Sequence, residues 1–203
     1  MLANQLPIVI GIAGKAGSGK DEFAQCLTYA GLNKDSQSEI VIVHLADRMK
    51  RLVEDVLGIL SYRMSWGEGK ERKYILGDKT MTGREILQKF GVAIRDSVSP
   101  HFWAEQITGW KYQHRQMDFI IVPDIRFIEE AELCDILVLI NRDSEPIKEC
   151  DHVSETSLDF LENDPPDWVV ENNGTVQDLQ VVADKVLKSA YDSFIKEHTT
   201  SWE

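Results

Sequence analysis

Residues 14–21 read GKAGSGKD, and their first seven positions fit the spacing G-x-x-x-x-G-K. The apolar run before them, residues 8–12, is rich in β-branched side chains, as expected of a buried parallel strand. Residues 20–29 then show helical spacing, with Phe23, Ala24 and Leu27 on one face. A glycine-rich turn in this position lets backbone N–H groups point at phosphate oxygens, and the helix N-terminus adds positive charge. The stretch therefore predicts a strand, a phosphate-binding loop and a helix.

Two charged residues close this loop. Lys20 is suited to place a point charge on the β- and γ-phosphates of a nucleotide. Asp21 stands where such loops carry the Ser or Thr that binds Mg²⁺, and a carboxylate binds Mg²⁺ directly or through water. An ordinary glycine-rich turn is the alternative interpretation of the stretch.

Further elements follow along the chain. Four more apolar runs predict buried strands, at residues 40–45, 119–122, 136–140 and 168–170. Helical spacing predicts helices at about 48–57, from about Pro100, and at about 175–196. Thr82-Gly83-Arg84-Glu85 is a capping-box pattern that opens a helix through Phe90, and Gly91 is expected to close it. Residues 61–80 are polar and basic and fit no element.

Strands that alternate with helices predict a parallel sheet covered on both faces. The expected fold is therefore α/β, a three-layer sandwich with a five-stranded, mostly parallel sheet. We expect one domain over residues 1–203, with mobile insertions at about 58–98 and about 141–166.

Helical spacing also predicts which side chains are buried. Trp103, Ile107 and Trp110 align on one face, which suits either a core or a dimer interface, so a homodimer stays open. The apolar face of the C-terminal helix consists of Val176, Leu179, Val182, Val186, Ala190 and Phe194.

Composition narrows the class of partner. The net charge of −12 argues against a nucleic-acid surface, which needs clustered Lys and Arg. All nine arginines fall between Arg48 and Arg142, so a second phosphate site is expected in the middle of the chain, although surface charge is the alternative.

No apolar run reaches the length of a membrane span. Cys26, Cys134 and Cys150 lack metal-binding spacing, which fits a reduced, cytoplasmic setting.

A second polar group follows the strand at 119–122. Asp124 and Arg126 come at its carboxyl end, where ligands bind in open α/β sheets. Asp124 is suited to hold Mg²⁺ or orient an acceptor, and Arg126 to grip a phosphate. In the alternative interpretation Asp124 caps the next helix and Arg126 pairs with Glu129 or Glu130.

Several blocks in this order resemble the deoxynucleoside monophosphate kinases of tailed bacteriophages, a branch of the P-loop nucleoside monophosphate kinases. The resemblance runs from residue 8 to about residue 187. Its blocks are Gly14 to Asp21, Leu45 to Lys50, Arg84 to Gly91, Pro100 to Trp103, Asp124 to Phe127 with Glu130, His152 to Glu155, and Asn172 to Thr175.

The resemblance implies a P-loop kinase fold, ATP and Mg²⁺ as cofactors, and a role for each matching residue. The segment at 58–98 would bind the acceptor, and the segment at 141–166 would act as a lid. The residues expected to bind ATP are Gly14, Lys15, Ala16, Gly17, Ser18, Gly19, Lys20, Asp21, Asn173 and Gly174. The residues expected to bind the acceptor are Lys50, Arg84, Gln88, Arg95 and Arg126. The expected catalytic residues are Lys20, Asp124, Arg126 and Arg142, and the expected Mg²⁺ ligands are Asp21 and Asp124.

The function that these features predict is phosphoryl transfer from ATP to a (deoxy)nucleoside monophosphate, a small-molecule partner, in the cytoplasm. For a phage-encoded chain this would be the host cytoplasm. One alternative is a P-loop kinase for another small acceptor, such as dephospho-coenzyme A. Another is a nucleotide-binding interaction protein without catalysis, although Lys20 and the arginines that catalysis needs are all present.

Overall fold

The computed structural model describes residues 6–32, 38–60, 62–63, 69, 71–143, 157–162 and 165–199. The chain divides into two compact units. The first consists of Met1–Val43 and Ile107–Glu203, and the second of His44–Gln106. Each unit has its own hydrophobic core.

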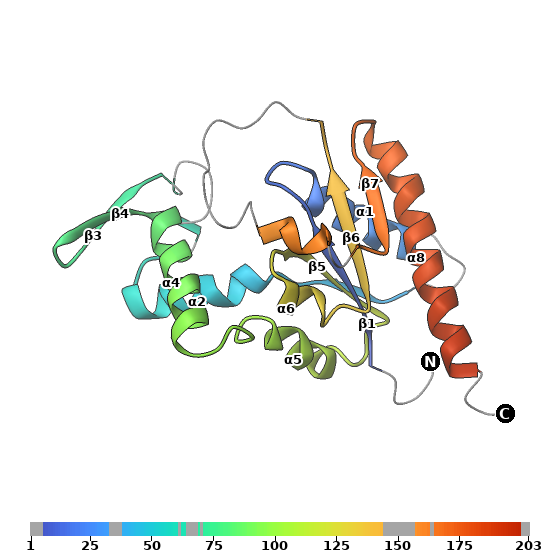
Figure 1. The fold of residues 1–203 in the computed structure, drawn as a ribbon, viewed down its shortest axis with the longest axis horizontal. Helices are drawn as coiled ribbons and strands as arrows, with labels where there is room; N and C mark the ends of the chain where they lie inside the picture. The colour runs from blue at the N-terminus through green and yellow to red at the C-terminus, as the bar shows by residue number, and fades with distance from the viewer. Residues whose placement is uncertain are drawn as a thin grey trace. The chain divides into compact units, whose positions relative to one another are not determined.

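The first unit is built on a five-stranded parallel sheet with the order β2-β5-β1-β6-β7 (Figure 1). The strands are β1 Ile8–Ala13, β2 Ile40–Ile42, β5 Phe119–Ile125, β6 Ile136–Asn141 and β7 Trp168–Glu171. β1 is buried along its whole length because it lies between β5 and β6 and carries apolar residues on both faces. The predicted α/β class with a five-stranded parallel sheet is confirmed.

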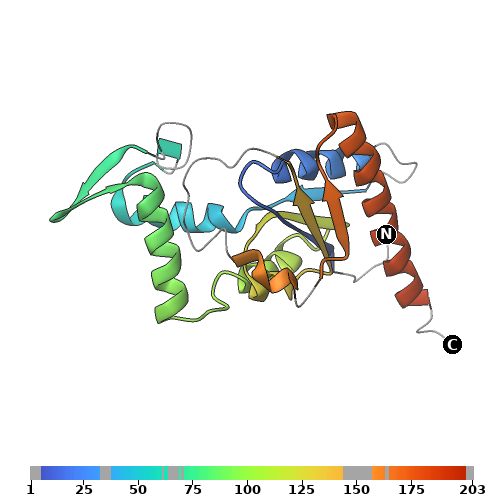
Figure 2. The same ribbon diagram turned by 45° about the horizontal axis from the view of Figure 1, so that its top comes forward.

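Helices cover both faces of this sheet. α1 Lys20–Leu32 and α8 Val176–Thr199 pack on one face, in a core that includes Ile10, Phe23 and Val186. α5 Glu105–Gln113 and α6 Ile128–Ala131 lie on the opposite side (Figures 1 and 2). The unit also contains the short 3-10 helix η2 Ser157–Glu162. The three predicted layers are therefore present.

The alternation of side chains along β1 separates the two faces. Ile8, Ile10 and Ile12 belong to the core beneath α1 and α8. Gly11 points the other way, and a Cβ added there would overlap Cys134 Sγ. This is the period of two that a strand imposes on its side chains.

The second unit contains α2 Leu45–Leu57, β3 Lys73–Leu76, β4 Lys79–Thr82 and α4 Gly83–Ser97. β3 and β4 form an antiparallel hairpin that turns at Gly77, whose φ is +64°. Val53 of α2 and Ile86 and Leu87 of α4 form the buried centre, with Met49, Tyr74, Met81 and Phe90 among the partly buried side chains around it. The hairpin covers part of the 61–80 stretch in which the sequence predicted no element.

Three predicted element boundaries are wrong. β2 ends at Ile42 and α2 already begins at Leu45, because the stretch 40–45 divides between a strand at the sheet edge and the next helix. α5 begins at Glu105 rather than near Pro100.

The third wrongly predicted boundary is the end of the helix that begins after Thr82. Gly91 does not close this helix, because α4 continues to Ser97. A Cβ at residue 91 would stand 3.0 Å from Met49 Sδ, so this glycine serves close packing against α2 inside the second unit.

Burial largely follows the predicted faces. Trp103, Ile107 and Trp110 are 8%, 0% and 4% exposed, so their side chains belong to cores rather than to an exposed dimer surface. Leu179, Val186 and Ala190 of α8 are buried as predicted, and Val182 packs against the core, whereas Val176 in the first turn is 52% exposed. Phe194 lies outside the side chains that the structure describes. Within the described ranges, no helix combines the length and apolar character needed to cross a membrane.

Candidate active site

The loop after β1 lies at the carboxyl edge of the parallel sheet. Ala13, the last residue of β1, is in register with Ile125 at the end of β5. A Cβ at Gly14 would stand 2.5 Å from the Ile140 carbonyl oxygen on β6 and 2.7 Å from Ser18 Oγ. The φ of Gly14 is +152°, a conformation that side chains rarely adopt. Only glycine therefore lets the chain leave β1 this close to β6.

Lys20 begins α1, and its side chain folds back onto the loop. Its Nζ donates to the carbonyl oxygens of Gly14 at 2.7 Å and of Lys15 at 2.9 Å. The N-terminus of α1 brings partial positive charge to the same place. The loop thus combines a lysine charge with a helix N-terminus, which favours an anionic ligand.

Ser18 adds a buried hydroxyl group to the loop. The residue is 3% exposed, and its Oγ has no hydrogen-bond partner among the described residues. A buried polar group without a partner costs about 1–3 kcal/mol of stability. Phosphate oxygens are strong acceptors, and loops of this geometry form anion-binding concavities. The loop therefore fits the phosphate groups of a nucleotide.

The two carboxylates predicted to bind Mg²⁺ both lie in the first unit. Asp21 is exposed in the first turn of α1. Asp124 is partly buried at the end of β5, the strand that pairs with β1. In the part of the chain that the structure describes, no three His, Cys, Asp or Glu side chains gather as a metal site. Mg²⁺ is usually held by one or two carboxylates together with phosphate oxygens and water, so these residue types fit the ion.

The turn between β5 and α6 is held by Glu130. This residue is 5% exposed, and its Oε2 accepts hydrogen bonds from the backbone N–H groups of Arg126 at 2.8 Å and Phe127 at 3.1 Å. The Arg126 side chain is exposed, directly after the end of β5. Glu130 thus holds Arg126 through the backbone, which differs from the side-chain ion pair weighed from the sequence.

The segments that follow β6 and β7 are joined to each other by side chains. Asp143 donates its backbone N–H to Asn173 Oδ1, and Asn173 Nδ2 donates to Asp143 Oδ2, both at 2.8 Å. Arg142 and Gly174 are exposed neighbours of this pair. Asn173, Gly174 and Arg142, three predicted site residues, therefore stand at the same edge of the sheet as the loop 14–21.

Asn172 connects this edge to the loop directly. Its Nδ2 donates to the Ser18 carbonyl oxygen at 2.8 Å, and its backbone N–H donates to the Asn141 carbonyl oxygen at 2.7 Å. A Cβ at Gly19 would overlap Asn172 Nδ2, and the φ of Gly19 is +97°. The loop is therefore packed tightly against the end of β7.

In the second unit, α4 presents three predicted acceptor residues on one face. Arg84, Gln88 and Arg95 occupy positions i, i+4 and i+11 of this continuous helix, and all three are partly buried. At about 100° per residue these positions lie within about 40° of one another. Arg95 reaches this face only because α4 continues past Gly91.

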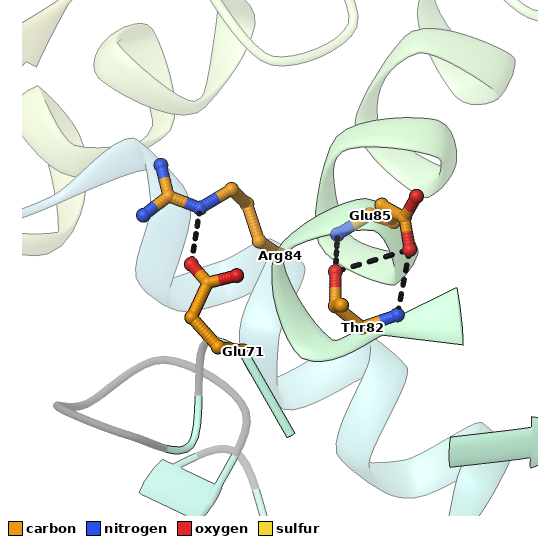
Figure 3. Close-up of polar contacts among 4 residues, drawn as sticks. All are labelled: Glu71, Thr82, Arg84 and Glu85. Carbon is orange, nitrogen blue, oxygen red and sulfur yellow. Dashed lines mark hydrogen bonds and ion pairs between the residues drawn. The ribbon is translucent and has the colours of Figure 1, made fainter. Parts of the chain in front are cut away.

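Figure 3 shows the N-terminal end of this face. Arg84 Nε lies 3.2 Å from Glu71 Oε1. The predicted capping box is confirmed: Thr82 Oγ1 accepts from the Glu85 backbone N–H at 3.2 Å, and Glu85 Oε2 accepts from the Thr82 backbone N–H at 2.7 Å. These backbone and side-chain hydrogen bonds with Thr82 lower the pKa of Glu85.

Lys50, the remaining predicted acceptor residue, lies on α2. Its Nζ contacts Asp47 Oδ1 at 2.9 Å, an ion pair between residues three positions apart on the helix. The structure thus divides the predicted residues between its units, with Lys50, Arg84, Gln88 and Arg95 in the second and the rest in the first. His152–Glu155, Cys150 and most of the lid-like segment at 141–166 lie outside the described residues.

Two site residues were not assigned a role from the sequence. Glu130 and Asn172 belong to blocks quoted above, and both act on backbone groups of neighbouring loops. The Glu130 contacts span three and four residues, so the position of this carboxylate three residues after the N-cap Phe127 could have predicted them. The Asn172 contact joins residues 154 positions apart and has no local signal.

Two comparisons with known proteins found similar sequences or structures. A family model described as deoxynucleotide monophosphate kinase matches residues 61–182. Among solved structures, a dephospho-CoA kinase from Campylobacter jejuni is similar over 92% of this chain and 98% of its own, with 14% sequence identity and a TM-score of 0.47. No curated protein matches the sequence.

Proposed function

Because this chain belongs to the deoxynucleotide monophosphate kinase family, it is a kinase that acts on nucleoside monophosphates, and we propose that ATP bound at residues 14–21 is the phosphoryl donor. The observation that carries this proposal is the geometry of the loop. It joins β1 to α1 at the carboxyl edge of a parallel sheet, with Lys20 folded onto it. Loops of this form cradle nucleotide phosphates with backbone N–H groups.

Lys20 is the residue that we assign to the transferring phosphoryl group. In the nucleotide-bound state its ammonium group exchanges the Gly14 and Lys15 carbonyl oxygens for phosphate oxygens. Phosphoryl transfer needs alignment and positive charge on the γ-phosphate rather than covalent help from the protein. Arg126 and Arg142, both exposed and both directly after strands of the sheet, supply further charge in this proposal.

Asp21 and Asp124 are assigned to the Mg²⁺ that accompanies ATP. The ion neutralises phosphate charge when it is bound. Asp124 comes from the strand beside β1, and Asp21 from the first turn after the loop, so the two carboxylates belong to the elements that flank the phosphate site.

The nucleoside of ATP is assigned to the segment after β7. Asn173 and Gly174 follow β7 at the carboxyl edge of the sheet, the edge that also carries the loop 14–21. The Asn173–Asp143 hydrogen bonds keep this segment in place. Arg142 is the neighbour of Asp143 in the chain, so the same hydrogen bonds restrain its backbone.

The acceptor is assigned to the second unit. Arg84 and Arg95 suit a monophosphate because guanidinium groups bind phosphate oxygens in pairs. Gln88 lies between them on the same face of α4, and an amide side chain can hydrogen-bond a base edge. Lys50 adds a fourth polar group from α2. From these residues and the family we propose that the acceptor is a deoxynucleoside monophosphate. The reaction would take place in the cytoplasm.

The test is ADP release from Mg-ATP in the presence of a panel of ribo- and deoxyribonucleoside monophosphates. We expect turnover with at least one deoxynucleotide. Lys20→Ala should reduce kcat by about 10²–10³, as for other deletions of a charge-stabilising group. Turnover that survives this substitution at the wild-type rate would remove Lys20 from the site.

Lys188→Ala is the matched control, because Lys188 is an exposed lysine of α8 outside the site. It should leave kcat and KM unchanged. If no nucleotide is phosphorylated while ATP still binds, the acceptor assignment is wrong, and dephospho-coenzyme A and small metabolites are then the acceptors to try.

A further inference from the structure

Asn172 makes a contact that none of the roles assigned above explains. Its side-chain Nδ2 donates to the backbone carbonyl oxygen of Ser18, inside the loop proposed to bind ATP. A carbonyl oxygen can only accept, so the amide nitrogen of Asn172 must be the atom that faces it. The contact therefore identifies Asn172 as a hydrogen-bond donor to the loop backbone.

The direction of one peptide group follows from this bond. In a trans peptide the C=O and the next N–H lie in one plane and point in opposite directions. With the Ser18 C=O directed at Asn172, the Gly19 N–H must point away from Asn172. Gly19 adopts φ +97°, and a glycine is free to adopt other conformations, so a hydrogen bond from outside the loop can restrict the orientation of this peptide.

Asn172 itself is firmly placed. Its backbone N–H donates to the Asn141 carbonyl oxygen at 2.7 Å, which continues the pairing of β6 with β7 by one residue. Asn173 is bound twice to Asp143, on the segment after β6. Thr175 is joined to Asp178 at the start of α8 by hydrogen bonds of 2.7–3.3 Å. The Asn172 side chain thus extends to the loop from a backbone segment that these hydrogen bonds hold in place.

We propose that Asn172 is a positioning residue of the phosphate site, which sets the Ser18–Gly19 peptide so that the Gly19 N–H is directed at the phosphates of the bound nucleotide. The inference rests on the proposed function of the loop and adds a determinant of its geometry from the far end of the chain. Asn172 does not touch the nucleotide in this proposal.

The test compares Asn172→Asp and Asn172→Ala. The aspartate has the same shape but lacks the donor and repels the Ser18 carbonyl oxygen, whereas the alanine only removes the donor. We expect ADP to bind roughly 10- to 100-fold more weakly to Asn172→Asp, the range for one lost hydrogen bond to a charged group. Asn172→Ala should show a smaller loss. KM for ATP should rise in both variants while KM for the acceptor stays within about twofold.

Gln180→Ala is the matched control. Gln180 Nε2 donates to the Cys26 carbonyl oxygen at 2.9 Å, so it makes the same kind of bond over the same 154 positions, but to the middle of α1. Gln180→Ala should lower the melting temperature by about as much as Asn172→Ala does, and it should leave the affinity for ADP unchanged. An equal loss of ADP affinity in Gln180→Ala would overturn the assignment, because the effect would then be one of general stability.

A spectroscopic measurement reports on the peptide itself. The chain has 13 glycines, so selective ¹⁵N-glycine labelling gives few amide signals. In the wild-type protein the Gly19 signal should shift on addition of ADP, and in Asn172→Asp this shift should be lost or reduced. An unchanged shift, or failure of both Asn172 variants to fold, would overturn the positioning role. A wild-type protein that does not bind ADP at all would instead overturn the proposed function of the loop.

Discussion

At the scale of single residues, two of the cations assigned to the acceptor, Arg84 and Lys50, each lie beside a carboxylate. Arg84 lies 3.2 Å from Glu71, and Lys50 lies 2.9 Å from Asp47. All four side chains are at least 25% exposed, and ion pairs of this kind contribute about 0–1 kcal/mol. A phosphate can therefore compete for either cation at little cost.

We predict that Glu71→Gln strengthens binding of the anionic acceptor. Removal of the carboxylate takes away a weak competitor for Arg84, so KM for the acceptor should fall by about two- to fivefold with kcat unchanged. The difference should shrink as salt is added, because exposed charges are screened.

Asp78→Asn serves as the control for this change. It removes one exposed negative charge from the hairpin turn without touching Arg84. A rise of KM in Glu71→Gln would contradict the prediction and would mean that Glu71 holds Arg84 in its binding position.

At the scale of elements, the N-terminus of α4 is held by the reciprocal Thr82–Glu85 bonds (Figure 3). The lowered pKa of Glu85 means that its carboxylate stabilises the fold fully above the ordinary glutamate pKa of about 4.3. As the pH falls through the lowered pKa, protonation removes this contribution.

Glu85→Gln should therefore melt below the wild-type protein at pH 7, and the gap between them should narrow towards pH 3. Thermal unfolding recorded across this range is the measurement. Asp192→Asn, which removes an exposed carboxylate from α8, should show no such narrowing. A difference in melting temperature that stayed constant down to pH 3 would mean that the cap does not depend on the charge of Glu85.

The junction of β5 with α6 depends on Glu130 in a similar way. Glu130→Ala should lower the free energy of unfolding by about 2 kcal/mol, because two backbone N–H groups lose their shared buried acceptor. Since Arg126 is one of those two residues, kcat should fall as well.

Glu130→Gln keeps an acceptor oxygen and should lose much less of both quantities. Urea unfolding and initial rates, measured on the same preparations, separate the two effects. Wild-type kcat in a destabilised Glu130→Ala would show that Arg126 does not depend on this support.

At the scale of the whole molecule, the first unit depends on close contact between β1 and the layer behind it. A Cβ at Gly11 would overlap Cys134 Sγ and lie 3.0 Å from Ile125 Cγ1. Cys134 is partly buried, and desolvation of its thiol raises the pKa of that group. A side chain at position 11 therefore has no room without movement of this layer.

We predict that Gly11→Ala costs about 1–3 kcal/mol of stability, the range for overpacking in a core. Combination with Cys134→Ala should return part of that loss, because the substitution removes the overlapping sulfur. The coupling between the two changes is measured by a double-mutant cycle of unfolding free energies. Additive effects would mean that the strain lies elsewhere, at Ile125 for example.

The sequence by itself determined the features whose contacts are local. The loop 14–20, the strand before it, the helix after it and the Thr82–Glu85 cap each depend on residues a few positions apart, and all were predicted. The five strands were also predicted, because buried parallel strands form continuous apolar runs. Family membership rests on the match of the family model to residues 61–182.

Only the tertiary structure decided features that depend on distant partners. Glycine is a residue type that often ends a helix, but Gly91 lies inside α4, where Met49 of α2 is close to it. Arg95 consequently joins Arg84 and Gln88 on one face. Asn172 reaches Ser18 over 154 positions, and no pattern along the chain marks such a contact. The physical reason is the same in each case: packing and hydrogen bonding act through space, whereas periodicity and capping act along the chain.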